Sequence, residues 1–242
     1  MSGVADRSMV HANARRIVEE VGECCVAANR NPDSVEVVAV TKYVDAETTR
    51  WVAEAGLRNL GENRVQSWLP KIDAEGLSDV HWHMIGHLQR NKVRRILPHV
   101  TMVHSVDSSR LLMAIDRIAS EINADHESSK LSTELLIEVN ISGDGNKTGL
   151  AIDDVIPLFE QWCESQRSNE VQVVGLMAMA SQAAEASRRT QFSNLRTMRD
   201  DLSVRFGIEL PVLSMGMSGD FAEAIAEGAT HVRIGSRFFA AS

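Results

Sequence analysis

The stretch VEVVAVTKY (35–43) joins an almost unbroken apolar run to a lysine near its end. Such runs are typical of parallel strands, which are buried on both faces of their sheet. Longer segments with apolar residues at helical spacing separate this stretch from others like it. The similar stretches are LRNLGEN (57–63), VHWHMIG (80–86), VTMVHSVD (100–107), TELLIEVNIS (133–142), VQVVGLMAMA (171–180), PVLSMGMS (211–218) and HVRIGSRFF (231–239).

These eight strand candidates, each followed by a helix except the last, favour an α/β fold, a closed (β/α)8 TIM barrel. An open, doubly wound sheet is the alternative, although no G-x-G-x-x-G follows the first strand. An extra helix is predicted before the first strand, at about 7–29, because apolar residues there form one stripe. No break in composition indicates a second domain, so we expect residues 1–242 to form one domain. The stripe consists of Val10, Ala14, Ile17, Val21, Cys25 and Ala28.

Composition narrows the class of protein. The 25 lysines and arginines stand against 33 acidic residues, and the net charge of −8 argues against a dedicated nucleic-acid binder. Three cysteines are too few for a disulfide framework, so we expect a reducing, cytoplasmic compartment. No apolar run reaches the ~18 residues that cross a bilayer, and we expect no secretory signal.

Lys42 is the first residue that breaks the apolar pattern. It shares a strand face with Val38 and Val40, and in a barrel it would stand at the carboxyl end, where barrel active sites lie. Among apolar side chains an amine loses hydration of its charged form, which favours a nucleophile able to form a Schiff base with an aldehyde. A lysine that merely extends into solvent from a strand end is the alternative.

Two small-residue clusters, Ser218-Gly219 and Gly235-Ser236, follow the seventh and eighth strands. Backbone N–H groups and hydroxyls at these positions are the usual phosphate site of a barrel, although glycine and serine also favour ordinary turns. Arg233 lies in the apolar run just before the second cluster and requires an acceptor. That acceptor is either a salt-bridge partner or a ligand.

Other polar residues near predicted strand ends have simpler interpretations. Asn63 could contact a ligand or cap a helix. Lys147 in GNKTG (145–149) lies on the loop after the fifth strand, where it could sit near the mouth of the barrel or simply be solvated. His81 and His83 share one strand face, as two metal ligands might, but the neighbouring strands offer too few further ligands, so we predict no metal.

Taken together and in order, the motifs AVTKY, GENRVQ, WHMIGHLQRNK, EVNIS…NKTG, GLMAMA, LSMGMSGD and VRIGSRFF resemble the pyridoxal phosphate homeostasis proteins (the YggS/PROSC family). The resemblance runs from about residue 10 to the end. It implies a barrel similar to the N-terminal domain of alanine racemase, a fold-type III protein that binds pyridoxal 5'-phosphate (PLP).

The resemblance also implies roles for individual residues. Lys42 would hold PLP as a Schiff base, with Asn63 beside the ring and Arg233 facing the pyridine nitrogen. Lys147 would influence cofactor transfer. The phosphate would lie against Ser214, Ser218 and Gly219 of SMGMSGD and Gly235 and Ser236 of RIGS.

The implied function is to sequester PLP and deliver it to apo-enzymes, with a part in vitamin B6 and amino-acid homeostasis and no evident turnover. An arginine at the pyridine nitrogen would leave the ring a poor electron sink. Racemases of this fold use a second acid–base tyrosine from a further domain, which we expect this chain to lack because it ends soon after RFF. Its one tyrosine is Tyr43. We expect a monomer. A PLP-dependent racemase and a phosphosugar-binding barrel without PLP are the alternatives.

Overall fold

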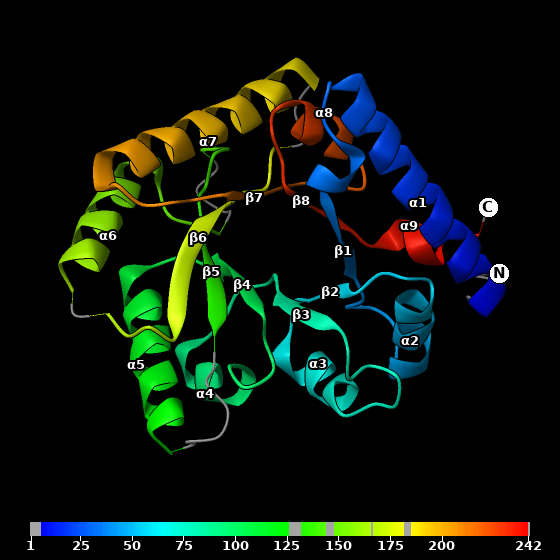
Figure 1. The fold of residues 1–242 in the computed structure, drawn as a ribbon, viewed down its shortest axis with the longest axis horizontal. Coiled ribbons are helices and arrows are strands. Elements are labelled where there is room, and N and C mark those ends of the chain that lie inside the picture. Colours follow the sequence, from blue (N-terminus) through cyan, green and yellow to red (C-terminus); the bar gives the residue numbers. More distant parts are fainter. Residues whose placement is uncertain (1–5, 126–131, 144–147, 166, 182–184, 242) are drawn as a thin grey trace.

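The structure, a computed structural model, describes residues 6–125, 132–143, 148–165, 167–181 and 185–241. Eight parallel strands form a closed barrel in the order β1-β2-β3-β4-β5-β6-β7-β8, with β8 pairing with β1 (Figure 1). The predicted closed barrel is therefore confirmed over the open sheet. The strands are β1 (Glu36–Val40), β2 (Asn59–Glu62), β3 (His81–Met84), β4 (Met102–Val106), β5 (Thr133–Glu138), β6 (Val171–Met177), β7 (Val212–Met217) and β8 (His231–Ile234).

Helices surround the sheet and cover its outer face (Figure 1). Their apolar stripes and the outward side chains of the strands form one continuous core. That burial removes a large apolar area from water and is the main stabilising contribution. The helices are α1 (Arg7–Ala27), α2 (Ala46–Glu54), α3 (Val65–Ile72), α4 (Val93–Ile96), α5 (Ser109–Asp125), α6 (Ile152–Glu164), α7 (Glu185–Phe206), α8 (Phe221–Ala226) and α9 (Ser236–Phe239), with the short 3-10 helices η1 (Pro32–Ser34) and η2 (Arg90–Lys92).

The extra N-terminal helix is confirmed as α1, which begins at an Asp6 cap whose side chain accepts from the Met9 N–H. The expectation that the eighth strand runs to residue 239 is wrong. β8 ends at Ile234, and Ser236–Phe239 turns into α9, which packs against α1. Phe238 is thereby buried, and its carbonyl accepts a hydrogen bond from Asn13 of α1.

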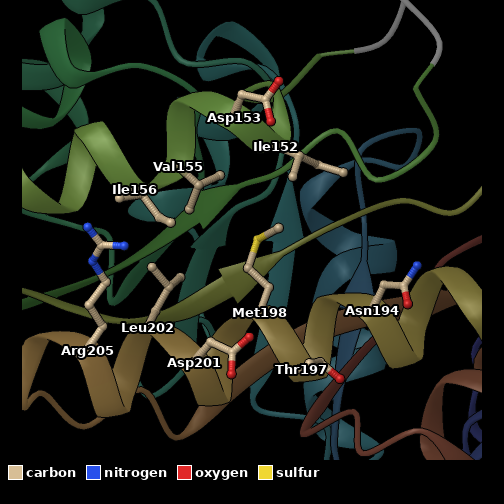
Figure 2. Close-up of a pocket in the computed structure, with 10 residues that line it drawn as sticks. All are labelled: Ile152, Asp153, Val155, Ile156, Asn194, Thr197, Met198, Asp201, Leu202 and Arg205. Carbon is tan, nitrogen blue, oxygen red and sulfur yellow. The ribbon is translucent and has the colours of Figure 1, made fainter.

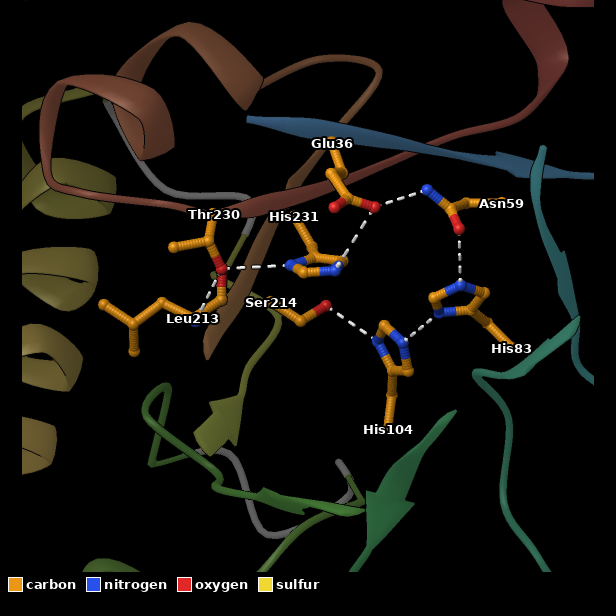
Figure 3. A network of polar contacts seen from close by, with 8 residues as sticks. All are labelled: Glu36, Asn59, His83, His104, Leu213, Ser214, Thr230 and His231. Carbon is orange, nitrogen blue, oxygen red and sulfur yellow. Dashed lines mark hydrogen bonds and ion pairs between the residues drawn. The ribbon is translucent and has the colours of Figure 1, made fainter. Parts of the chain in front are cut away.

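The inside of the barrel is divided between apolar and polar side chains. A small apolar cluster of Met102, Leu136, Val174 and Met177 lies apart from the main core. The remaining interior contains buried histidine and serine side chains (Figure 3), together with the buried Arg233. Burying polar groups costs free energy unless they are hydrogen-bonded, so their partners are informative. Among the described residues, no helix is long and apolar enough to cross a membrane.

Candidate functional site

Barrel closure brings the ends of four neighbouring strands to one arc of the carboxyl mouth. β7 pairs with β8, β8 with β1, and β1 with β2. In parallel strands all carboxyl ends lie on the same edge, so the segments that follow these four strands are neighbours. Those segments carry six of the predicted site residues: Lys42, Asn63, Ser218, Gly219, Gly235 and Ser236.

Lys42 lies in the turn between β1 and α2, two residues beyond the end of the strand at Val40. It is partly buried, and its Nζ lies 4.8 Å from the centroid of the Tyr43 ring. Tyr43 itself is 85% exposed. The amine therefore stands at the rim of the mouth, over the face of an aromatic ring, where a ligand can reach it.

The backbone just before Lys42 is clamped by a buried ion pair that sequence reasoning missed. The Thr41 hydroxyl donates to Glu62 Oε1 at 2.7 Å, and Lys71 Nζ of α3 donates to the Thr41 carbonyl at 2.8 Å. Lys71 and Glu62 also form an ion pair of 2.5 Å, and all three residues are buried. The Glu62 side chain points to the opposite face of β2 from the residues that face the mouth. A charged residue within an apolar strand was therefore the one signal in the sequence for this ion pair.

The turns after β7 and β8 are tight and lie against the end of β1. A Cβ on Gly235 would lie only 3.2 Å from Val40 Cβ, so glycine allows this close approach. Gly216 in β7 has φ +93°, a conformation that other residues rarely adopt. Ser218 is partly buried and Ser236 is exposed, which leaves both hydroxyls beside the mouth as donors.

Arg233 lies beneath these turns and is only 5% exposed. Its Nη1 donates to the Ser214 carbonyl at 2.8 Å and to Ser214 Oγ at 2.6 Å, and its Nη2 donates to the Ala178 carbonyl at 3.0 Å. No carboxylate of the described residues lies within ion-pair distance, so the salt-bridge alternative is wrong, and the acceptors found are neutral. Burial lowers the pKa of Arg233 to about 10, which leaves it cationic at neutral pH.

The structure groups Ser214 with Arg233 rather than with the turns at the mouth. Ser214 is fully buried in β7, and its Oγ also lies 2.8 Å from Nδ1 of His104. Arg233 Nη1 and His104 Nδ1 thus both lie within hydrogen-bond distance of this hydroxyl. Ser214 lies within β7, whereas Ser218 and Gly219 follow the strand at the mouth, and the phosphate contact expected of Ser214 stays a prediction.

Asn63 directly follows β2 and is partly buried. The residue at the cap position of α3 is Arg64, with no side-chain cap bond, so the helix-cap interpretation of Asn63 is wrong. A Cβ on Gly86 would lie 2.4 Å from the Asn63 carbonyl oxygen, which shows how closely the turns after β2 and β3 pack. Lys147 lies outside the described residues. No cluster of potential metal ligands occurs among the residues described.

Two carboxyl groups near Arg233 were also missed in the sequence. Burial raises the pKa of Glu138 at the end of β5 and the pKa of Asp220 after β7. Glu138 accepts from Thr148 Oγ1 at 2.5 Å, and Asp220 accepts from the Met217 N–H at 2.6 Å. Both act on Arg233 at longer range and favour its charged form. The mouth thus combines an amine, a buried guanidinium and hydroxyl-rich turns.

A groove of about 760 Å³ on the outer layer has different chemistry (Figure 2). It lies between α6, which contributes Ile152, Ile156 and Asp153 to its lining, and α7, which contributes Met198 and Asp201. Its one cation, among the lining residues, is Arg205, which pairs with Glu160. This groove offers no amine and no set of anion donors, so the barrel mouth is the better candidate.

The fold and this site define a barrel of the alanine racemase type. The family model "Alanine racemase, N-terminal domain" matches residues 6–242. Curated relatives narrow the class further: the chain belongs to the pyridoxal phosphate homeostasis protein family. A member from Aquifex aeolicus is 37% identical over 93% of this chain and 94% of its own length. A member from Pseudomonas aeruginosa is 37% identical over 97% of this chain and 96% of its own length.

A solved structure supports the same assignment. The structure of PipY of Synechococcus elongatus with PLP bound has a TM-score of 0.78 and 34% identity, covering 90% of this chain and 99% of that chain. The expected family and the expected fold are therefore both confirmed.

Proposed function

We propose that this chain binds PLP at the carboxyl mouth of its barrel, sequesters it and delivers it to apo-enzymes. The observation that carries the proposal is the juxtaposition of Lys42, Arg233 and the two serine–glycine turns on one arc of the mouth. The similar protein PipY has a solved structure with PLP bound. PLP supplies an aldehyde that condenses reversibly with a primary amine and releases water.

Each part of the arc fits one part of that cofactor. Lys42 is the amine within reach of the mouth. Ser218, Gly219, Gly235 and Ser236 supply hydroxyl and backbone N–H donors suited to a phosphate. Asn63 lies on the neighbouring turn, where it would contact the ring.

Arg233 fits the remaining part, the pyridine nitrogen. It has five N–H groups, and acceptors within the described residues account for three of them. Because Arg233 stays cationic at neutral pH, it would donate to a pyridine nitrogen without protonating it. An unprotonated ring stabilises carbanions poorly.

The same residues argue for a carrier without turnover. A two-base racemase needs a second acid–base group placed against the substrate. The chain has one tyrosine, Tyr43, which is 85% exposed and turns its ring face toward Lys42 Nζ. We propose accordingly that the protein acts in the cytoplasm as a monomer, that it supports vitamin B6 and amino-acid homeostasis, and that Lys147 assists transfer.

Addition of PLP to the purified protein tests the proposal. We expect a band at about 420 nm from the carbon–nitrogen link, and borohydride trapping followed by peptide mapping should place the label on Lys42. Lys42→Ala should abolish the band with the fold intact. Lys92→Ala removes a partly buried lysine after β3 and serves as the matched control. A label on another side chain, or none, would refute the assignment.

The absence of turnover needs its own measurement. A chiral assay over the common amino acids should detect no racemisation. Turnover of even ~1 s⁻¹, an ordinary enzymatic rate, would favour the racemase instead. Transfer is tested by mixing the loaded protein with an apo-enzyme and following recovery of that enzyme's activity against an equal amount of free PLP.

A further inference from the structure

A continuous chain of hydrogen bonds crosses the barrel interior from Arg233 toward the opposite mouth, and Figure 3 shows it from Ser214 to Glu36. Arg233 Nη1 lies 2.6 Å from Ser214 Oγ, which lies 2.8 Å from His104 Nδ1. His104 Nε2 lies 2.9 Å from Nδ1 of His83, whose Nε2 lies 3.2 Å from Asn59 Oδ1. The side chains come from β8, β7, β4, β3 and β2, so the chain exists only in the closed barrel.

The far end of this chain lies at the amino mouth of the barrel. Asn59 Nδ2 donates to Glu36 Oε2 at 2.5 Å, and the Glu36 side chain is 55% exposed. A carboxylate only accepts hydrogen bonds, so the Asn59 amide turns its nitrogen toward Glu36. The amide oxygen of Asn59 then faces His83. The amide orientation is thus set from the solvent side.

The Asn59 end and neutral rings together determine the direction of every bond in this chain. The Asn59 oxygen only accepts, so a neutral His83 carries its proton on Nε2, donates to that oxygen and accepts at Nδ1 from His104 Nε2. A neutral His104 is then an acceptor at Nδ1, so Ser214 Oγ, which accepts from the Arg233 guanidinium, gives its own proton to that nitrogen. Each ring has one proton and is neutral.

Burial is consistent with neutral rings. His83 is 3% exposed and His104 is fully buried. Burial lowers the pKa of His83 to about 3 and lowers the pKa of His104 well below its ordinary value. A charged ring would put a proton on both nitrogens, so a charged His104 would reverse its bond to Ser214 and a charged His83 would set a second donor against the Nε2–H of His104.

We propose that His104 and His83 are positioning residues for Arg233: they fix the Ser214 hydroxyl as an acceptor and so fix the orientation of the guanidinium beneath the carboxyl mouth. The effect on a bound cofactor rests on the proposed function, in which Arg233 faces the pyridine nitrogen. The hydrogen-bond directions do not depend on it.

The directions are tested on the parent protein without PLP. Long-range nitrogen–proton NMR spectra of ¹⁵N-histidine-labelled protein report which ring nitrogen carries the proton, and the exposed His99 gives a reference signal from a solvated ring. We expect the Nε2–H form for both His83 and His104. A proton on Nδ1 of either ring, or a charged ring at neutral pH, would overturn the proposal.

The positioning role is tested with paired substitutions. His104→Leu removes the acceptor for Ser214, whereas His104→Gln keeps one acceptor and one donor. We expect His104→Leu to weaken PLP binding by about tenfold and shift the absorption maximum, because Arg233 loses its fixed acceptor. His104→Gln should restore binding to within about threefold. Ser214→Ala provides a second variant that breaks the same link.

The outcomes separate the two proposals. His104→Leu or Ser214→Ala with the affinity and absorption maximum of the parent would overturn the positioning role. A parent protein that binds no PLP would overturn the proposed function, and with it the role toward the cofactor, while the NMR result on the hydrogen-bond directions would stand. Urea unfolding of each variant shows whether the loss of affinity exceeds any loss of folded protein.

Discussion

Replacing Lys71 by methionine is the sharpest test of how the backbone before Lys42 is held. In the structure Lys71 is 3% exposed and Glu62 is fully buried, and the two form an ion pair of 2.5 Å. In Lys71→Met the Thr41 hydroxyl is the one donor to Glu62 that remains among the described residues, and it bonds to Oε1. The other oxygen of Glu62, Oε2, has no partner even in the parent protein. A buried carboxylate without its cation is strongly unfavourable.

The magnitude follows from that burial. Breaking a buried ion pair by removing one partner costs about 3–5 kcal/mol. For a chain of this size each kcal/mol lowers Tm by about 2–4 °C, so we expect a fall of roughly 6–20 °C. Urea unfolding and calorimetry measure both quantities. Lys92→Met, at a partly buried lysine outside the ion pairs of the described residues, should change stability by less than about 0.5 kcal/mol.

A double substitution separates charge from packing. In Glu62→Gln/Lys71→Met no charge remains buried, and the glutamine oxygen still accepts from Thr41. We expect the double variant to be more stable than Lys71→Met by at least about 1 kcal/mol. If Lys71→Met lies within about 1 kcal/mol of the parent, or the double variant is the less stable of the two, the reasoning fails.

Two further predictions concern pH and the phosphate site. Because burial lowers the pKa of His83 from 6.5 to about 3, the unfolded chain takes up a proton across that range that the folded protein does not. The free energy of unfolding should therefore fall as the pH falls from 6.5 toward 3. Between pH 7 and pH 5, the urea midpoint of His83→Gln should fall less than that of the parent protein. Equal falls in the two proteins would contradict this. Ser218→Asp should weaken PLP binding at least about tenfold by repulsion of the phosphate, whereas Ser34→Asp, before β1 at the other end of the barrel, should not. Unchanged affinity in Ser218→Asp would move the phosphate site elsewhere.

Much of the fold could be predicted from local patterns. Apolar runs such as VEVVAV (35–40) indicated strands buried on both faces, and a single stripe indicated α1, because both patterns depend on side-chain periodicity alone. Lys42 was expected at the carboxyl mouth as part of the first strand, and the structure has it in the turn just after that strand. Strand ends were less certain: SRFF (236–239) reads as apolar strand but forms α9, which packs against α1 and buries Phe238.

The partners of the polar residues were decided by the tertiary structure. Periodicity shows that Ser214, His104 and Arg233 interrupt apolar strands, but Ser214 and His104 are 110 positions apart in the chain. Which polar groups meet inside a barrel depends on its closure and on the register between strands, and neither is encoded in one strand alone. The sequence by itself therefore determined a barrel with a lysine at its mouth. Only the closed structure decided that Ser214 supports Arg233 from below and that Lys71 and Glu62 hold the backbone before Lys42, because these contacts join side chains from different strands and helices.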